Sequence, residues 1–377
     1  MAAPADLPAH APRPDWRTRV LRWVARPGFQ AWAARFPLSR RYVRRKGTDL
    51  FDLVQGFVSS QVLLALVDLQ LCHHLADGPR HPDDLAGVVD VRADRLARLL
   101  QAGAALGLLR RTRDGRFGLE PSGAALIGVP GLEAMIAHHR ILYRDLADPV
   151  AFLRGDTEPE LAQLWPYVFG AGAAEDPARA RRYSRLMADS QALVAADTLG
   201  AVSLSGVTHL LDVGGGTGVF AEAAARANPQ LQVTLMELPA VAEAARERLA
   251  GSDVSDRIDI VGGSFRDEAL PTGADAISLV RVLFDHEDDT VVALLERVYA
   301  ALPPGGTVIV SEPMSGGARP DRAGDVFYSF YTMAMGTGTV RAPDRIARLL
   351  TDAGFVRVSA PRPLRSFVTR VVTATRP

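Results

Sequence analysis

The sequence contains only one cysteine, Cys72, among its 377 residues. A single thiol excludes an internal disulfide framework and any metal site built from several cysteines. Histidine, aspartate and glutamate nowhere show the spacing of metal ligands, and the sequence contains no Ser-His-Asp signature. We therefore expect neither a metalloenzyme nor a serine hydrolase.

The sequence also lacks an excess of either charge, because 43 basic residues balance 43 acidic ones. Nucleic-acid binding generally requires a surplus of basic charge, so we expect no nucleic-acid partner. No run reaches the roughly 18 to 20 uncharged residues that cross a bilayer, and the N-terminus has no signal-peptide core. These absences predict a cytoplasmic protein. The 48% of hydrophobic residues over this length predicts two domains.

Residues 1–46 form a basic, aromatic N-terminal arm. Its eleven arginine and lysine residues are accompanied by only two acidic residues, Asp6 and Asp15. Large aromatic residues lie among these charges, at Trp16, Trp23, Phe29, Trp32 and Phe36. This mixture suits peripheral membrane contact, with arginines directed toward anionic headgroups. It equally suits an arm that packs on a dimer partner with its arginines in solvent.

Residues 47–200 are predicted to form a helical, winged-helix domain. Apolar residues from Phe51 to Leu69 are too closely spaced for a solvated face, which predicts a buried helix. A short helix beginning at 81–86, a second helix at 92–106 and a hairpin at 108–119 then follow in the order of a winged helix.

A winged helix either binds DNA, as in a regulator, or serves as a dimerisation module. In the second helix, Arg92, Arg95 and Arg98 alternate with Asp90 and Asp94, so the face is not clearly cationic. We favour dimerisation and keep a DNA-binding regulator as the alternative from another functional class.

The rest of the chain divides into a helical part and an alternating part. Residues 131–200 look helical, with the clearest helix at 183–199 and a loop at 170–176. Beyond residue 206, helical stretches alternate with strand-like runs, at 207–213, 232–237, 258–261, 276–280 and 307–312. Residues 201–377 are therefore predicted to form an α/β domain with a parallel, doubly wound (Rossmann-like) sheet covered on both faces.

The first strand of this domain runs into a glycine-rich turn, Asp212-Val213-Gly214-Gly215-Gly216-Thr217-Gly218. Glycines let backbone N–H groups approach a ligand at the carboxyl end of a strand. Val219 stands where a dinucleotide fingerprint needs glycine or alanine, and the Gly-Lys-Ser/Thr of a P-loop is absent. Asp212 would repel a pyrophosphate but suits an amino group and a sulfonium. The pattern predicts S-adenosylmethionine (SAM) at Asp212, Gly214, Gly216 and Gly218.

Two further features support a nucleoside ligand rather than a mere tight turn. Glu237 ends the next strand, about twenty residues on, where an acid accepts hydrogen bonds from ribose hydroxyls. Gly262-Gly263-Ser264-Phe265 follows the third strand.

From about Phe51 to its end, the chain resembles the SAM-dependent O-methyltransferases of the plant-caffeate and bacterial-antibiotic type. The resemblance implies a winged-helix dimerisation domain, a class I methyltransferase domain and a homodimer. It places the cofactor motif at Asp212 to Gly218, the ribose acid at Glu237 and the adenine motif at Gly263-Ser264-Phe265, where Ser264 replaces the usual acid. Arg281 matches a family lysine or arginine near the cofactor.

Three stretches are similar to the carotenoid-methylating members of this family: residues 281–289, 312–325 and 330–338. This similarity implies methylation of the tertiary hydroxyl of a 1-hydroxycarotenoid, a hydrophobic substrate dissolved in the membrane. Aromatic and methionine residues in 327–335 could line an apolar tunnel for a polyene, or could pack in a core. A soluble aromatic or polyketide alcohol is the alternative acceptor.

The family members that act on phenols place a histidine base in a Leu-His-Asp-Trp motif, which in this chain reads Leu283-Phe284-Asp285-His286. Phe284 cannot accept a proton. His286, two residues later, and His139 are therefore the predicted catalytic residues, with His138, Tyr328 and Tyr331 as further proton acceptors. Because a tertiary alcohol is a very weak acid, proton loss accompanies or follows methyl transfer, and a strong base is not required beforehand.

Overall fold

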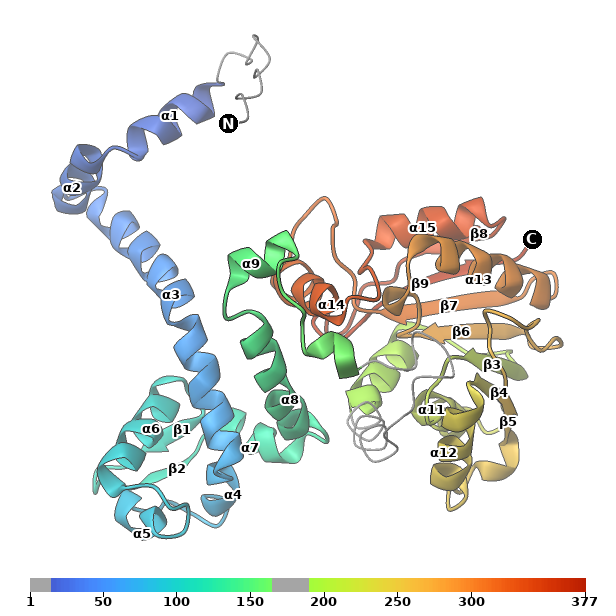
Figure 1. The fold of residues 1–377 in the computed structure, drawn as a ribbon, viewed down its shortest axis with the longest axis horizontal. Helices are drawn as coiled ribbons and strands as arrows, with labels where there is room; N and C mark the ends of the chain where they lie inside the picture. The colour runs from blue at the N-terminus through green and yellow to red at the C-terminus, as the bar shows by residue number, and fades with distance from the viewer. Residues whose placement is uncertain (1–14, 165–189) are drawn as a thin grey trace.

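The computed structural model describes residues 15–164 and 190–377 (Figure 1). The loop predicted at 170–176 lies outside these residues, as does the first part of the helix predicted at 183–199. The remainder of that helix is present, because residues 190–201 are helical.

The N-terminal arm consists of α1 (Trp16–Val24), α2 (Pro27–Arg35) and the start of α3 (Arg40–Asp68). Because α3 continues through residue 46, the arm and the next domain share one helix. In Figure 1, α1, α2 and the first part of α3 project away from the rest of the chain, whereas the end of α3 packs on α6 and α8.

The prediction that the helix after Phe51 is buried was wrong for its first half. Phe51, Val54 and Phe57 are 61%, 71% and 71% exposed, and in α3 only Leu64 and Leu66 are buried. The apolar residues do share one face of the helix, but none of the described residues of this chain covers that face. Within the described residues, α3 alone is long and apolar enough to cross a membrane, and 11% of its most apolar window is buried. Length and composition alone are weak support for a span, since helices of soluble proteins pass the same test.

The helices and hairpin of the next domain follow the predicted order. They are α4 (Leu71–His74), α5 (Pro82–Ala86), α6 (Ala93–Ala105), the antiparallel strands β1 (Leu109–Arg111) and β2 (Phe117–Leu119), and α7 (Pro121–Gly128). The His81 side chain caps α5, and the apolar face of α6 buries Leu96 and Leu100 against α3 and β1. Three further helical segments lead toward the second domain: α8 (Leu132–Asp145), α9 (Pro149–Arg154) and η1 (Leu161–Leu164).

The second domain is a seven-stranded sheet in the order β5-β4-β3-β6-β7-β9-β8. Its strands are β3 (His209–Val213), β4 (Gln232–Glu237), β5 (Ile258–Gly262), β6 (Ala276–Val280), β7 (Thr307–Glu312), β8 (Val356–Ser359) and β9 (Arg370–Thr375). The first five in spatial order are parallel, as predicted. Two strands that were not predicted, β8 and β9, extend the sheet, and β9 pairs antiparallel with both β7 and β8.

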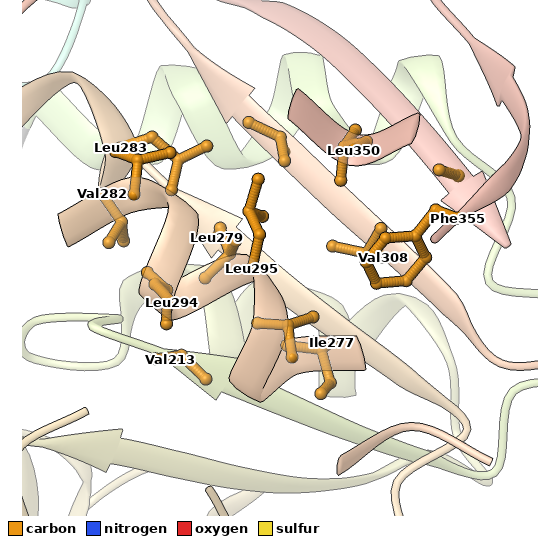
Figure 2. Packing of buried hydrophobic residues seen from close by; sticks show 14 of the residues in the cluster. Val213, Ile277, Leu279, Val282, Leu283, Leu294, Leu295, Val308, Leu350 and Phe355 are labelled. Atoms are coloured by element: carbon orange, nitrogen blue, oxygen red, sulfur yellow. The ribbon is translucent and has the colours of Figure 1, made fainter. Parts of the chain in front are cut away.

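Helices cover both faces of this sheet. They are α11 (Val219–Ala227), α12 (Pro239–Leu249), α13 (Asp288–Ala301) and α15 (Pro343–Asp352), with the shorter turns η3 (Ser255–Arg257) and η4 (Leu283–Asp285). Figure 2 shows one of the two cores, in which Leu294 and Leu295 of α13 and Leu350 of α15 pack on Ile277 and Leu279 of β6. The other core places α11 and helix 190–201 on the opposite face.

β4 pairs with one edge of β3 and β6 with the other. The chain therefore crosses over β3 after β5, and the strand order reverses at this point. Such a switch point is where α/β sheets bind ligands, beyond the carboxyl ends of the strands. A π-helix, η5 (Arg322–Tyr328), runs into α14 (Ser329–Met335) after β7.

Candidate functional site

The turn after β3 can be built only with glycine at several positions. Gly214, Gly216 and Gly218 have positive φ angles of 67°, 60° and 81°, which side chains rarely tolerate. A Cβ atom on Gly215 would lie 2.1 Å from Oδ2 of Asp212, whereas one on Gly216 would meet nothing within 4 Å. The turn is therefore closed on the side of the sheet and open at Gly216.

Asp212 lies fully buried at the end of β3 beside this turn. Its Oδ1 accepts a hydrogen bond from the Ser278 hydroxyl at 2.6 Å, while its Oδ2 has no partner among the described residues. Burial raises the pKa of Asp212 to about 7. An unpartnered carboxylate oxygen is costly in a protein interior, and a cationic group of a ligand would relieve that cost.

Glu237, at the end of β4, holds the glycine turn in place. Its Oε1 accepts the N–H of Gly216 at 3.2 Å and its Oε2 accepts the N–H of Leu238 at 2.5 Å. Burial raises the pKa of this carboxyl, and the two backbone donors oppose that rise. Each carboxylate oxygen keeps lone-pair capacity for a further donor, as two ribose hydroxyls require.

The loop after β5 meets the same edge of the sheet, because the Gly263 N–H donates to the Glu237 carbonyl at 2.8 Å. Ser264 is engaged within this loop: its N–H donates to Glu268 and its hydroxyl accepts the N–H of Arg266. The Phe265 ring contacts His286 edge-on, with ring centroids 5.4 Å apart.

Arg281 follows β6 and has a positive φ of 60°. Its Nη1 donates to the Ser190 hydroxyl at 2.9 Å, and its guanidinium lies 6.0 Å from the centroid of the Phe284 ring. The structure thus brings all the predicted cofactor residues to the carboxyl ends of the parallel strands β3 to β6. Within this group of residues, Arg281 is at the end that faces the Phe284 ring.

Phe284 belongs to a separate apolar cluster. There it packs with buried side chains from α8, α9, η1 and α14, namely Leu142, Phe152, Leu161, Tyr331 and Met335, and with the half-buried Phe327 and Phe330. The predicted apolar segment 327–335 therefore contributes to this cluster, while Met333 is exposed. The Tyr331 hydroxyl is 2.9 Å from Nε2 of His138.

The two predicted catalytic histidines lie in different surroundings. His139 faces the apolar cluster, with its ring centroid 5.1 Å from that of Phe327, and its Nδ1 donates to the Met135 carbonyl at 2.6 Å. His286 is buried, and its Nδ1 accepts a hydrogen bond from Arg266 at 2.9 Å. Burial lowers the pKa of both, and with help from Arg266 and Arg341 it takes that of His286 to about 4.

Sequence reasoning missed two carboxyl groups beside Phe284. Glu312 ends β7, is fully buried, and accepts the Phe284 N–H at 3.1 Å through Oε2. Asp285 is the next residue after Phe284. The signal for Glu312 was an acidic residue at the end of a mostly apolar strand, since a carboxylate is seldom fully buried without a partner. Within the described ranges, no group of three or more histidine, cysteine or acidic side chains could hold a metal ion.

Comparison with protein families finds two matches in the chain. Residues 51–128 match the model of the O-methyltransferase dimerisation domain, and residues 143–356 match that of the O-methyltransferase domain. The demethylspheroidene O-methyltransferase of Cereibacter sphaeroides is 57% identical over 93% of this chain and 92% of its own length. That of Rhodobacter capsulatus is 54% identical over 91% and 85%, respectively.

Solved structures share the fold. The mitomycin 7-O-methyltransferase MmcR matches with a TM-score of 0.73 and 26% identity over 90% of this chain and all of its own. Human N-acetylserotonin methyltransferase in complex with SAM matches with a TM-score of 0.73 and 25% identity over 88% of this chain and 97% of its own.

Proposed function

The chain belongs to the family of SAM-dependent O-methyltransferases with an N-terminal dimerisation domain, and on this basis we propose that it methylates the tertiary hydroxyl of a 1-hydroxycarotenoid. It is an O-methyltransferase that uses SAM and forms homodimers. The observation that carries the carotenoid proposal is the 57% and 54% identity, over nearly the whole chain, to two demethylspheroidene O-methyltransferases.

The residues at the carboxyl ends of β3 to β6 suit SAM. The unpartnered Oδ2 of Asp212 fits its cationic part, Glu237 its ribose, and Gly214, Gly216 and Gly218 give it close backbone contact. We assign Ser264 and Phe265 to its adenine and Arg281 to the boundary with the acceptor. When bound, SAM supplies an electrophilic methyl group to a hydroxyl oxygen.

The cluster around Phe284 suits the other substrate. Aromatic and aliphatic side chains from α8, α9 and α14 surround the position where a phenol-directed enzyme would need a polar base. An apolar wall excludes water from the hydroxyl and aligns a long apolar molecule by contact rather than by hydrogen bonds. His139 and His286 stay the sequence-derived candidates for the proton acceptor.

The three segments of the chain then divide the work. Residues 1–46 contact the membrane, residues 47–200 dimerise and line the acceptor site, and residues 201–377 bind SAM. In this proposal the protein is a cytoplasmic enzyme at the membrane periphery. The winged-helix segment within residues 47–200 serves dimerisation and does not bind DNA.

We expect the purified homodimer to transfer labelled methyl groups from SAM to a 1-hydroxycarotenoid in detergent micelles. The product is the methyl ether, identified by chromatography and mass spectrometry. Plant-type phenols, offered at equal concentration, are the comparison acceptors, and we expect at least tenfold slower methylation of them. Faster methylation of the phenols would replace the carotenoid by a soluble aromatic alcohol as the acceptor.

The arm has the surface for membrane contact. None of the residues of α1 is buried. Four aromatic rings of the arm form a continuous series. The ring centroid of Phe29 lies 3.9 Å from that of Trp23 and 5.7 Å from that of Trp32, and the Trp32 centroid lies 4.8 Å from that of Phe36. Trp16, Trp23 and Trp32 are each more than half exposed. Arginines on the same helices would meet anionic headgroups.

We expect the double variant Trp16→Ser, Trp23→Ser to bind anionic phosphatidylglycerol vesicles on the order of 100-fold more weakly, because two large apolar side chains no longer enter the interface. Cosedimentation of the homodimer with vesicles measures the change. Val292→Ser, at an exposed position on α13, is the matched control and should bind like the wild type. Equal binding of the double variant and the wild type would assign the arm to a protein contact instead.

A further inference from the structure

Three buried oxygen atoms near Phe284 have no hydrogen-bond partner among the described residues. They are Oδ1 of Asp285, Oε1 of Glu312 and Oγ1 of Thr337. Buried polar atoms are nearly always paired in native proteins, so an unpaired set in one place calls for a cause. Catalytic groups and their proton-transfer partners are one established cause.

These three atoms belong to segments in direct contact. Glu312 accepts the Phe284 N–H, which ties the end of β7 to η4. A Cβ atom on Gly338 would lie 2.0 Å from the Phe284 carbonyl oxygen and 2.7 Å from Cα of Asp285, so the segment after α14 packs directly on η4. Glu312 and the segment that contains Thr337 therefore pack on the loop that carries Phe284 and Asp285.

Neither carboxyl group forms an ion pair with a described residue. The buried guanidinium of Arg341 donates instead to the carbonyls of Leu283 and His286 and to the carboxylate of Asp288. Glu312 is fully buried, whereas Asp285 as a whole residue is half-buried with its Oδ1 enclosed. Burial of two neighbouring carboxyl groups favours a state in which at least one of them keeps its proton.

On the basis of the proposed function, we propose that the Asp285 carboxylate accepts the proton of the substrate hydroxyl, with Glu312 as the positioning residue beside it. The hydroxyl oxygen forms its bond to the methyl carbon with a lone pair. The electron pair of the broken carbon–sulfur bond stays on the sulfur, and the O–H proton moves to an oxygen of Asp285. Charge and atoms balance, because SAM loses its positive charge and Asp285 becomes neutral.

The surroundings of Asp285 bring its pKa close to neutral pH, which suits a proton acceptor. Burial raises its pKa to about 7, and Arg281 opposes the rise. Burial also raises the pKa of Glu312 to about 8; Arg341 and backbone donors oppose this, and Asp285 adds to it. The other titratable groups nearby are Tyr331, whose pKa burial raises, and the neutral His286. A base whose pKa lies near the working pH is the most effective proton acceptor.

The test compares single-turnover methylation of the 1-hydroxycarotenoid by the wild type, Asp285→Asn and Glu312→Gln, with SAM saturating. For Asp285→Asn we expect a rate lower by about 100-fold, the lower end of the range for removing a general base. Its Kd for SAM should stay within twofold of the wild type. Asp289→Asn, an exposed position on α13, is the matched control and should keep the wild-type rate.

The pH profile separates a chemical role from a structural one. A proton acceptor works only when deprotonated, so the wild-type rate should rise with pH through about 7 and level off above it. Asp285→Asn should lose this rise, whereas Glu312→Gln should keep it, because burial holds the proton on Glu312 up to about pH 8 and the amide that replaces it is also uncharged.

Three results would overturn the proposal. The first is Asp285→Asn with a rate within threefold of the wild type and an unchanged pH profile. The second is a parallel loss of SAM affinity, which indicates a structural role. The third is a larger loss in His139→Ala or His286→Ala than in Asp285→Asn. Failure of the proposed function itself would look different, because the wild type would then leave the carotenoid unmethylated.

Discussion

Replacing Glu237 with alanine is expected to raise the Kd for SAM by about 1000-fold, since each hydrogen bond to a charged group is worth roughly 1.5 to 3 kcal/mol. The variant loses both acceptors for the ribose hydroxyls. It also frees the N–H groups of Gly216 and Leu238, which Glu237 holds at 3.2 and 2.5 Å. The glycine turn then no longer presents its backbone to the ligand in a fixed shape. Isothermal titration calorimetry of the homodimer measures the change.

The matched control for this variant is Glu243→Ala. Glu243 lies on α12, close in sequence to Glu237, but it is exposed and, among the described residues, pairs only with Arg246 at the surface. Its removal should leave the Kd unchanged and alter stability little. Glu237→Gln should bind SAM with an intermediate Kd, because the amide keeps one acceptor oxygen. A Kd for Glu237→Ala within threefold of the wild type would contradict the assignment of this edge of the sheet to SAM.

The double variant Val54→Asp, Phe57→Asp is expected to convert the homodimer to monomers. Both side chains are 71% exposed in the single chain and lie in the segment that matches the dimerisation domain. If the second copy covers this face of α3, each dimer of the variant must bury four aspartates without partners. Each buried, unpaired charge costs several kcal/mol, so the dimer dissociation constant should rise by at least about 10,000-fold. Sedimentation equilibrium measures it directly.

Val150→Asp is the matched control for dimerisation, because Val150 is also exposed but lies on α9, outside the matched segment. It should remain a dimer. A double variant on α3 that still sediments as a dimer would move the interface elsewhere in the dimerisation domain.

The sequence was most informative where local chemistry decides the structure. The glycine-rich turn from Asp212 to Gly218 was predictable from residue type, and three of its glycines have the positive φ angles that other residues rarely adopt. The parallel strands were predictable because strands buried on both faces have continuous apolar runs. Strand β8 escaped prediction because it is short, largely exposed and irregularly paired, so no apolar run marks it.

Other features depend on what packs against them, and sequence patterns do not contain that information. The apolar spacing of α3 correctly indicated a face that avoids water, but not which chain covers it. Likewise, nothing in the local sequence distinguishes the carboxyl of Asp285 from that of an exposed aspartate. The enclosure of its Oδ1 follows from β7 and the segment around Gly338, which are distant in the chain.

Arg341 ties the Phe284 loop together through two carbonyls of η4 and its neighbour, and through Asp288 at the start of α13. A loop fastened in this way has lost most of its conformational entropy during folding rather than during catalysis. Substrate binding then needs to order the substrate but not this loop, and more of its contact energy remains for affinity. Such preorganisation lowers the barrier to methyl transfer, because the groups around the acceptor are already in place when the substrate binds.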